Sequence, residues 1–228
     1  MTTLTSQSLA AETVRNAKTV HLNDAAPALV EMAIARGEGS LSVDGAFVTD
    51  TGQFTGRSPK DKFIVRDALT EKLVWWDNTS AMSSAQFDTL LADFATSMGG
   101  GELFVQELYA GADLKHQLNV AVLTPSAWHA LFIRNLLIRP AKAALEGFAP
   151  DVTILHNPDF KADPAKHGTR SETVIALDFS RNIVLIGGTA YAGEIKKSVF
   201  SLFNFHAPNK GVLPMHCSAN TGKAGDTA

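Results

Sequence analysis

The stretch Ile183–Lys197, IVLIGGTAYAGEIKK, carries the pattern that decides the fold. The apolar run at its start has the length of a buried strand, and the two glycines that follow allow a tight turn. We expect a helix to begin near Gly193 or Glu194. Such a unit points free amide groups and the positive end of a helix dipole at one place, which suits an anion. The alternative is that the glycines only turn the chain and the lysines only solvate the helix, because short glycine motifs often occur by chance.

Two adjacent lysines, Lys196 and Lys197, lie near the expected helix start. Successive helical residues point about 100° apart, so only one of the two can enter a site while the other flanks it. The flanking charge lowers the pKa of its neighbour, and burial acts in the same direction. A lysine kept neutral in this way is able to bind a metal ion or to transfer a proton.

A second stretch near the end of the chain, MHCSAN at 215–220, places a histidine beside the single cysteine. We expect His216 to lie on a short apolar strand. Histidine is the commonest metal ligand, although a histidine at a strand end is also frequently structural. Cys217 is expected to be a small buried residue rather than a nucleophile, because no base and orienting group are visible for it.

A third stretch, TGRSPKDK at 55–62, is a basic loop. Arg57 follows a glycine and can present its planar guanidinium to a carboxylate, which a solvated lysine does less specifically. The alternative is an exposed basic turn, because runs of charge are commonly solvated surface.

Composition excludes several classes of protein. The 228 residues carry a formal net charge of −3 and one cysteine. No general attraction for nucleic acid follows from this charge, and neither a disulfide framework nor a multi-cysteine zinc site is possible. The N-terminus lacks the pattern of a signal peptide, and no apolar stretch is long enough to cross a bilayer. We expect a soluble, cytoplasmic protein whose partners are small molecules rather than nucleic acid or membrane.

The order of the expected elements is mixed, which favours an α+β fold with a mixed sheet over a strictly alternating one. The first fifteen or so residues are polar and are expected to be irregular. Helices are expected from Asn23 or Asp24 to Gly37, from Ser83 (with Gln86 at capping-box spacing) to Gly99, and from Thr124 to about Ile138. Strands are expected in a hairpin over 41–50 and at 62–66, 72–76, 102–110, 118–124, 152–155, 173–179 and 183–186.

Four motifs, in this order and spacing, resemble the ATP-dependent phosphoenolpyruvate carboxykinases: TGRSPKDKFIV, IRNLLIRP, IGGTAYAGEIKKSVFS and LPMHCSANTG. The resemblance runs from about residue 20 to the end. It implies conversion of oxaloacetate and ATP to phosphoenolpyruvate, ADP and CO2, a step of gluconeogenesis. It also implies Mg²⁺ bound with ATP and a protein-bound Mn²⁺.

The resemblance assigns roles to particular residues. Arg57 matches the arginine that contacts the oxaloacetate carboxylate and the departing CO2, and Tyr191 matches a tyrosine in the same pocket. Lys197 and His216 match the residues that bind Mn²⁺ and approach the γ-phosphate. Lys196 matches the neighbour that keeps the metal-binding lysine neutral, as a lysine ligand must be.

The resemblance also implies a division into residues 1–211, an N-terminal domain of the carboxykinase fold, and 212–228, the first strand of a nucleotide-binding domain. The sequence contains no G-x-x-x-x-G-K-[ST] phosphate loop. We therefore expect the isolated chain to be inactive. Two alternatives stay open. The chain could be a non-catalytic module that binds a dicarboxylate or pairs with a nucleotide-binding chain, or a product in which residues 212–228 leave an apolar edge unpaired.

Overall fold

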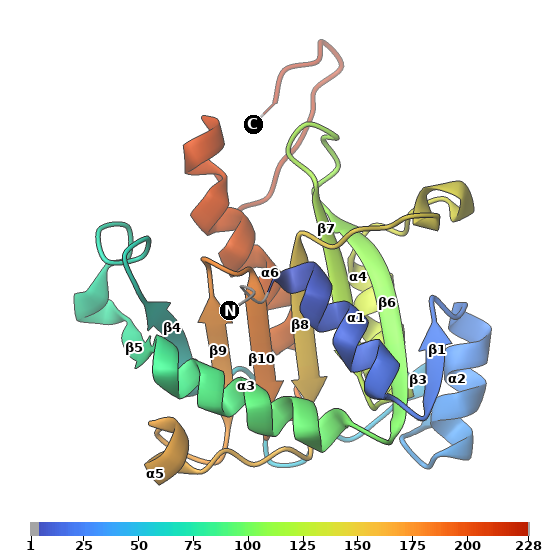
Figure 1. The fold of residues 1–228 in the computed structure, drawn as a ribbon. Coiled ribbons are helices and arrows are strands. Elements are labelled where there is room, and N and C mark those ends of the chain that lie inside the picture. Colours follow the sequence, from blue (N-terminus) through green and yellow to red (C-terminus); the bar gives the residue numbers. More distant parts are fainter. Residues whose placement is uncertain (1–4, 228) are drawn as a thin grey trace.

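The structure, a computed structural model, describes residues 5–227. A sheet runs through the middle of the molecule in the order β1-β6-β7-β8-β10-β9-β4-β5 (Figure 1). Neighbouring strands are parallel except for the β6–β7 and β9–β10 pairs, which are antiparallel, so the predicted mixed sheet is confirmed. The strands are β1 (Thr19–Leu22), β4 (Lys62–Arg66), β5 (Ser80–Ser83), β6 (Glu102–Ala110), β7 (Leu118–Thr124), β8 (Val152–Asn157), β9 (Val174–Asp178) and β10 (Ile183–Gly187).

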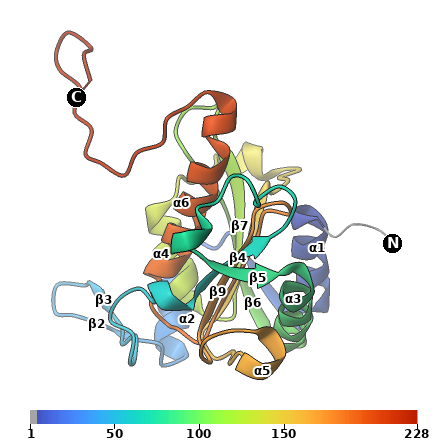
Figure 2. The ribbon, with the colours of Figure 1, turned by 90° about the vertical axis from the view of Figure 1, so that its left-hand side faces the viewer.

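Helices cover both faces of the sheet (Figure 2). On one face lie α1 (Ser6–Asn16) and α3 (Ser84–Met98). On the other lie α4 (Ala127–Leu136) and α6 (Gly193–His206), and α2 (Ala26–Ala35) packs on α4. The shorter elements are β2 (Ser40–Leu41), β3 (Phe47–Val48), α5 (Pro164–His167) and the 3-10 turns η1 (Pro59–Asp61), η2 (Trp76–Asn78), η3 (Lys142–Leu145) and η4 (Pro208–Lys210).

Strand β10 shows how the sequence pattern builds the core. Alternate residues of a strand point to opposite faces. Ile183 and Leu185 accordingly join the core under α1 and α3, while Val184 and Ile186 join the core under α6. Every residue of β10 is buried because both faces are covered, which is why the strand reads as a continuous apolar run.

The predicted capping box of α3 is confirmed. The hydroxyl of Ser83 accepts a hydrogen bond from the Gln86 amide at 3.2 Å, and the Gln86 side chain accepts one from the Ser83 amide at 2.9 Å. The helix ends before Gly99, as expected. The hairpin predicted over 41–50 is also present, as the antiparallel pair of β2 and β3.

The prediction of an irregular N-terminus was wrong for residues 6–16, which form α1. Thr5 caps the helix through its hydroxyl, which accepts from the Ser8 amide at 3.2 Å. Leu9 is 3% exposed in the core, and the hydroxyl of Ser6 lies 2.8 Å from that of Thr153 on β8. One buried stripe of side chains is enough to stabilise this mostly polar helix, because packing against the core contributes more to the stability of a helix than the helix propensity of its residues does.

The strand predicted at 72–76 was also wrong. Residues 72–75 lie in the turn region between β4 and η2, and Trp76 begins η2. The hydroxyl of Thr70 donates to the Val65 carbonyl at 2.8 Å, and the Trp76 indole donates to the Glu71 carbonyl at 3.2 Å. Local side-chain hydrogen bonds of this kind compete with a strand ladder.

Residues 212–227 form no strand in the structure. Beyond η4 the segment extends away from the body of the molecule (Figures 1 and 2), and Thr221 and Thr227 make only an isolated bridge. Cys217 is exposed, so the expectation of a buried cysteine was wrong. The assignment of this segment to a second domain stays a prediction.

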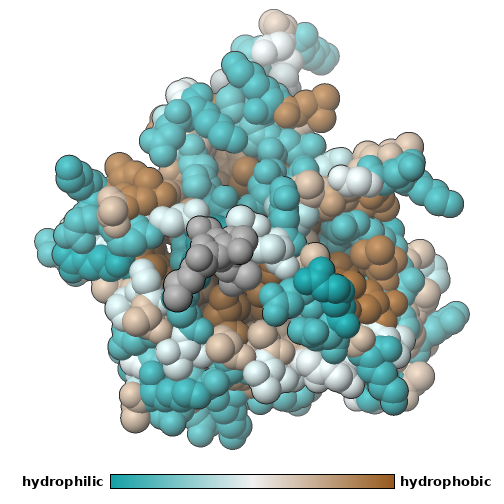
Figure 3. All heavy atoms as spheres, in the orientation of Figure 1, coloured by the Kyte–Doolittle hydropathy of each residue, from teal (hydrophilic) through white to brown (hydrophobic). Residues whose placement is uncertain are grey.

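Strand β1 is an edge strand that the sequence pattern did not predict. It pairs with β6 on one side only, and its apolar residues Val20 and Leu22 are 36% and 55% exposed. They line a groove of about 300 Å³ together with Val14 and Phe148, on the face shown in Figure 3. A strand of four residues with little burial shows too weak an alternation of apolar and polar residues to be recognised from sequence.

In the part of the chain that the structure describes, no helix has the length and apolarity needed to span a membrane.

Candidate functional site: a cation cluster on α6

A glycine turn joins β10 to α6 in the way that the sequence pattern predicted. Gly188 has φ +71°, and a Cβ placed there would lie 2.7 Å from the Glu172 carbonyl oxygen and 3.0 Å from Thr173 Cα. Only glycine fits this position without displacing backbone. The Thr189 hydroxyl then accepts from the Tyr191 amide at 3.1 Å, and α6 begins at Gly193.

We expect Gly188→Ala to lower the free energy of unfolding by about 1–3 kcal/mol, because the new methyl meets backbone at a positive φ. Urea unfolding of the purified chain measures this loss. Gly147→Ala is the matched control, since Gly147 has φ +72° with nothing within 4 Å of the place that an added Cβ would take. Equal losses in the two variants would contradict the steric account.

The first turn of α6 is not the open anion site that the pattern suggested. The amides of Glu194 and Ile195 already donate to the carbonyls of Tyr191 and Ala192, each at 3.1 Å. The side chain of Glu194 is also buried here and adds negative charge. Positive charge gathers one turn further along, at Lys196 and Lys197.

Lys197 and His216, both predicted site residues, come together in the structure. Lys197 Nζ lies 3.0 Å from His216 Nε2. The Phe200 ring supports both, with its centroid 5.2 Å from Lys197 Nζ and 5.1 Å from the His216 ring. The two groups lie 19 residues apart in sequence, so the approach of the 212–220 segment to α6 creates the pair.

The pKa of Lys197 is lowered, first by desolvation and then by the charges of Arg57 and Lys196. Lys196 itself is exposed. The two lysines therefore differ in burial, and the pKa shift of Lys197 has the expected direction, while the entry of Lys197 into a site stays a prediction. A lowered pKa increases the fraction of neutral amine, the form that can bind a metal ion.

Arg57 is exposed and belongs to the same electrostatic cluster. Its charge lowers the pKa of Lys62 as well as that of Lys197, and burial contributes most of the Lys62 shift. Lys62 Nζ donates to the Ser201 hydroxyl on α6 at 2.6 Å. The 55–62 loop is thus held against α6, and three cations from distant parts of the chain act on one another.

Tyr191 lies at the start of α6, half-buried. Its ring covers Gly193, where an added Cβ would lie 2.5 Å from the ring. Among the described residues, no hydrogen bond joins Tyr191 to Arg57 or Lys197. Its place in a common pocket stays a prediction.

The sequence analysis missed Lys62 and Glu194 as members of this cluster. Lys62 appeared as one of several cations in a basic turn, and nothing local distinguished it from Lys60. Glu194 carried no signal because an acidic residue in the first turn of a helix is ordinary. Only the approach of the 55–62 loop to α6 shows the relation.

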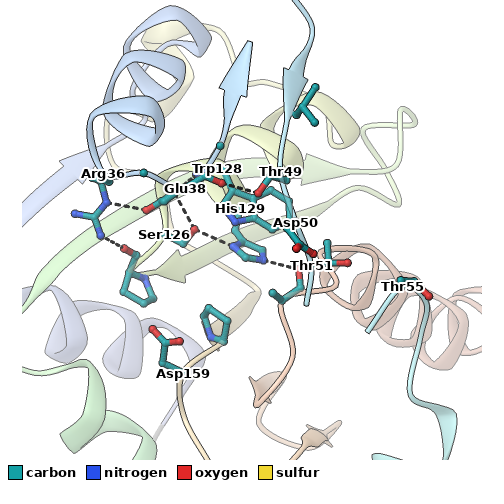
Figure 4. A pocket seen from close by; sticks show the side chains of 16 residues that line it. Arg36, Glu38, Thr49, Asp50, Thr51, Thr55, Ser126, Trp128, His129 and Asp159 are labelled. Carbon is teal, nitrogen blue, oxygen red and sulfur yellow. Dashed lines mark hydrogen bonds and ion pairs between the residues drawn. The ribbon is translucent and has the colours of Figure 1, made fainter. Parts of the chain in front are cut away.

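A cleft of about 840 Å³ is lined by residues that include Thr55, His129 and Ala190 (Figure 4). One of its charged groups, Glu38, serves the fold: its carboxylate accepts from the Ser126 hydroxyl at 3.1 Å and from the Trp128 amide at 2.9 Å, which caps α4. Arg36 donates to Glu38 at 2.7 Å. None of the predicted site residues lines this cleft, so it is distinct from the cation cluster.

Two buried histidines support the turn between this cleft and α6. His129 Nε2 lies 2.9 Å from the Ala190 carbonyl and His156 Nε2 lies 3.4 Å from the Thr189 carbonyl. Their rings lie 4.2 Å apart. Burial lowers the pKa of both, that of His156 to about 4. The pair is therefore neutral at pH 7 and acts as part of the core.

In the portion of the chain that the structure covers, no group of three or more His, Cys, Asp or Glu side chains is placed to hold a metal ion. The Lys197–His216 pair offers two nitrogen donors, and carboxylate oxygen donors do not adjoin it in these residues.

Comparison with known proteins identifies the chain's relatives. The family model described as "Phosphoenolpyruvate carboxykinase" matches residues 18–228. A protein of Methylobacterium nodulans named phosphoenolpyruvate carboxykinase (ATP) is 60% identical over 215 residues, 94% of this chain and 40% of the relative. Proteins of the same name from Mesorhizobium japonicum and Brucella anthropi are 61% and 56% identical, over 92% and 98% of this chain and 39% and 42% of the relatives.

The chain belongs to the phosphoenolpyruvate carboxykinase family, because the family model covers nearly its whole length. It spans about 40% of the length of the curated relatives that it matches.

Proposed function

We propose that this chain is the substrate-side part of an ATP-dependent phosphoenolpyruvate carboxykinase, which forms phosphoenolpyruvate, ADP and CO2 from oxaloacetate and ATP in gluconeogenesis. The observation that carries the proposal is the contact of Lys197 with His216 at 3.0 Å, within the field of the Arg57 charge. Family membership supports the same reaction.

The proposed reaction places negative charge at two positions, the carboxylate of oxaloacetate and the phosphoryl group. Arg57 would bind the carboxylate: its side chain is exposed and makes no hydrogen bond to a described residue. Loss of CO2 leaves an enolate whose oxygen accepts the phosphoryl group, and Lys197 and His216 would lie beside that group. Tyr191 would line the carboxylate side of the pocket.

We propose Lys197 and His216 as ligands of a protein-bound Mn²⁺, with Mg²⁺ carried by ATP. Their two nitrogen donors, Nζ and Nε2, lie 3.0 Å apart and would hold the ion together. When bound, such an ion neutralises charge on phosphoryl oxygens. Lys196 would act through its charge, which helps to keep Lys197 neutral.

The proposed domain division is 1–211 for the N-terminal domain and 212–228 for the start of a nucleotide-binding domain. The way in which the segment beyond η4 extends from the body of the molecule supports it (Figures 1 and 2). We further propose a cytoplasmic protein with ATP, CO2 and oxaloacetate or phosphoenolpyruvate as its partners, and neither nucleic acid nor membrane.

A hybrid protein tests the activity. Residues 18–228 replace the matching part of the Methylobacterium nodulans relative, to which the chain is 60% identical. The hybrid is expected to form phosphoenolpyruvate from oxaloacetate and ATP, measured by a coupled assay. A folded but inactive hybrid that still binds a dicarboxylate would instead support the non-catalytic binding module.

The substrate half of the site is testable in the 228-residue polypeptide alone. We expect oxalate, a dicarboxylate probe, to bind at millimolar concentration in isothermal titration, and Arg57→Gln to weaken binding about 10-fold or more, because a charge-assisted contact is lost. Arg15→Gln on α1, across the sheet, is the control. The same polypeptide is expected to form no phosphoenolpyruvate, because its sequence has no phosphate loop. Absence of oxalate heat would contradict the proposed substrate site.

A further inference from the structure

A buried carboxylate in the first turn of α6 lacks an ion-pair partner. Glu194 is 5% exposed, and none of the described basic side chains lies within ion-pair distance of it. Burying an unpaired charge is costly, so such a group normally has a structural or functional reason. The positive end of the helix dipole compensates only part of the cost.

The one hydrogen bond of the Glu194 side chain leads directly to the candidate site. Its Oε1 accepts from the backbone amide of Ser58 at 2.6 Å, across 136 residues of sequence. Ser58 is the residue after Arg57, so the carboxylate fixes the peptide unit from which the Arg57 side chain projects. The same helix carries Lys197, three residues after Glu194.

Other contacts hold the 61–62 end of the 55–62 loop, whereas the part of the loop next to Arg57 is held by Glu194. Asp61, 3% exposed, accepts from Arg170 Nε and Nη2 at 3.0 and 2.9 Å and from the Ser171 hydroxyl at 2.8 Å. Lys62 Nζ donates to Ser201 at 2.6 Å. The proximal end of the loop is tied to α6 through the Ser58 amide.

The charge of Glu194 also suits its surroundings. Burial raises the pKa of Glu194, and the Ser58 amide and the charges of Arg57 and Lys62 oppose that rise, each favouring the ionised form. A neutral acceptor would make the hydrogen bond to Ser58 but would leave the two cations to repel each other. A carboxylate both accepts the amide and reduces that repulsion.

We propose that Glu194 is a positioning residue, which holds the Arg57–Ser58 peptide unit against α6 and so sets the Arg57 guanidinium beside Lys197 for a carboxylate ligand. This inference rests on the proposed function, because it assigns Glu194 a role at the same substrate site. Glu194 does not itself touch the substrate; it acts through Arg57.

Hydrogen exchange of the Ser58 amide tests the contact directly. Nuclear magnetic resonance measures its exchange rate in the 228-residue chain, in three Glu194 variants and in one control variant. Glu194→Ala removes the acceptor, and Glu194→Asp keeps the charge but is too short to reach. We expect both to speed Ser58 exchange by about 10- to 100-fold, the range that follows from loss of a hydrogen bond to a charged acceptor. Glu194→Gln keeps an acceptor oxygen and is expected to stay within about 3-fold of the wild-type rate. Glu172→Ala, which removes an exposed carboxylate ion-paired with Lys161, is the control.

Oxalate affinity measured by isothermal titration on the same proteins gives the functional readout. Glu194→Ala is expected to weaken binding about 10-fold, with partial rescue in Glu194→Gln and no effect of Glu172→Ala. Because Glu194→Asp preserves the acid at the helix start, it replaces the alanine variant if that variant does not fold.

The two possible failures are distinguishable. Absence of oxalate binding by the wild-type chain overturns the proposed substrate site before any variant is measured. Normal wild-type binding, together with unchanged Ser58 exchange and affinity in folded Glu194→Ala or Glu194→Asp, overturns the positioning role alone.

Discussion

Replacing Lys197 with alanine in the hybrid protein is expected to lower kcat for phosphoenolpyruvate formation by about 10²- to 10³-fold. The pair of Lys197 Nζ and His216 Nε2, 3.0 Å apart, is the proposed point of contact with the phosphoryl group and its metal ion. The KM for oxaloacetate should change little, because Arg57 and its loop remain in place. A fall in kcat at constant KM identifies an interaction made in the transition state rather than in substrate binding.

Two further variants test whether Lys197 acts through a positive charge or as a neutral amine. One replaces Lys197 itself, and the other is a control. Lys197→Arg keeps a positive charge but cannot lose its proton, so it is expected to restore little activity. Lys72→Ala removes an exposed lysine whose charge is not among those acting on Lys197, and it is expected to leave kcat unchanged. Full rescue by arginine would contradict the metal-ligand role, and equal losses in Lys197→Ala and Lys72→Ala would contradict any specific role.

The elements that were predictable from sequence are those with a strong local cause. The turn after β10 needs Gly188 at positive φ, and the start of α3 needs the Ser83–Gln86 capping box. These features lie within a few residues of one another. A sequence pattern that involves only neighbouring residues predicts local structure without any knowledge of the segments that pack against it.

The elements that were missed depend on contacts between distant segments. Helix α1 exists because Leu9 and a few neighbours find a core that is built from α3 and the sheet. Strand β1 exists because β6 offers it a parallel edge. Neither segment has a hydrophobic period strong enough to predict its structure alone.

The candidate site divides in the same way. Residue type and position alone singled out Arg57, Lys196, Lys197 and His216, and the resemblance to a known family added Tyr191 and the role of each residue. The structure brings Lys197 to His216. The Ser58–Glu194 contact spans 136 residues and joins a backbone amide to a carboxylate. A backbone donor leaves no trace in the sequence, so this part of the site required the structure.

Stability of the 228-residue chain is expected to fall by about 3 kcal/mol between pH 6.5 and pH 4 through His156 alone. Its ring is fully buried on β8, and desolvation lowers its pKa to about 4. A neutral ring with its proton on Nε2 fits both contacts, since Nδ1 lies 3.0 Å from the Thr124 hydroxyl and Nε2 lies 3.4 Å from the Thr189 carbonyl. Unfolding releases the ring to its ordinary pKa near 6.5. Between these two pKa values the unfolded state binds a proton that the folded state does not bind. The contribution of His156 to the free energy of unfolding is therefore largely present above pH 6.5 and is lost as the pH falls towards 4.

Urea unfolding at pH 7, 6, 5 and 4 measures this loss, and His156→Gln isolates it. Glutamine cannot be protonated, so the variant is expected to be less stable at pH 7, because its fit is poorer, but to lose about 2–3 kcal/mol less than the wild type on going to pH 4. His129, whose pKa is lowered by burial and by His156, adds to the wild-type loss in the same direction. His21→Gln, on the edge strand β1, is the control for replacing a histidine outside the core. An unchanged pH dependence in His156→Gln would show that the ring is already accessible to protons in the folded protein. Because His156 holds the carbonyl of Thr189 in the turn that leads into α6, the same acid range is where the candidate site should first lose its order.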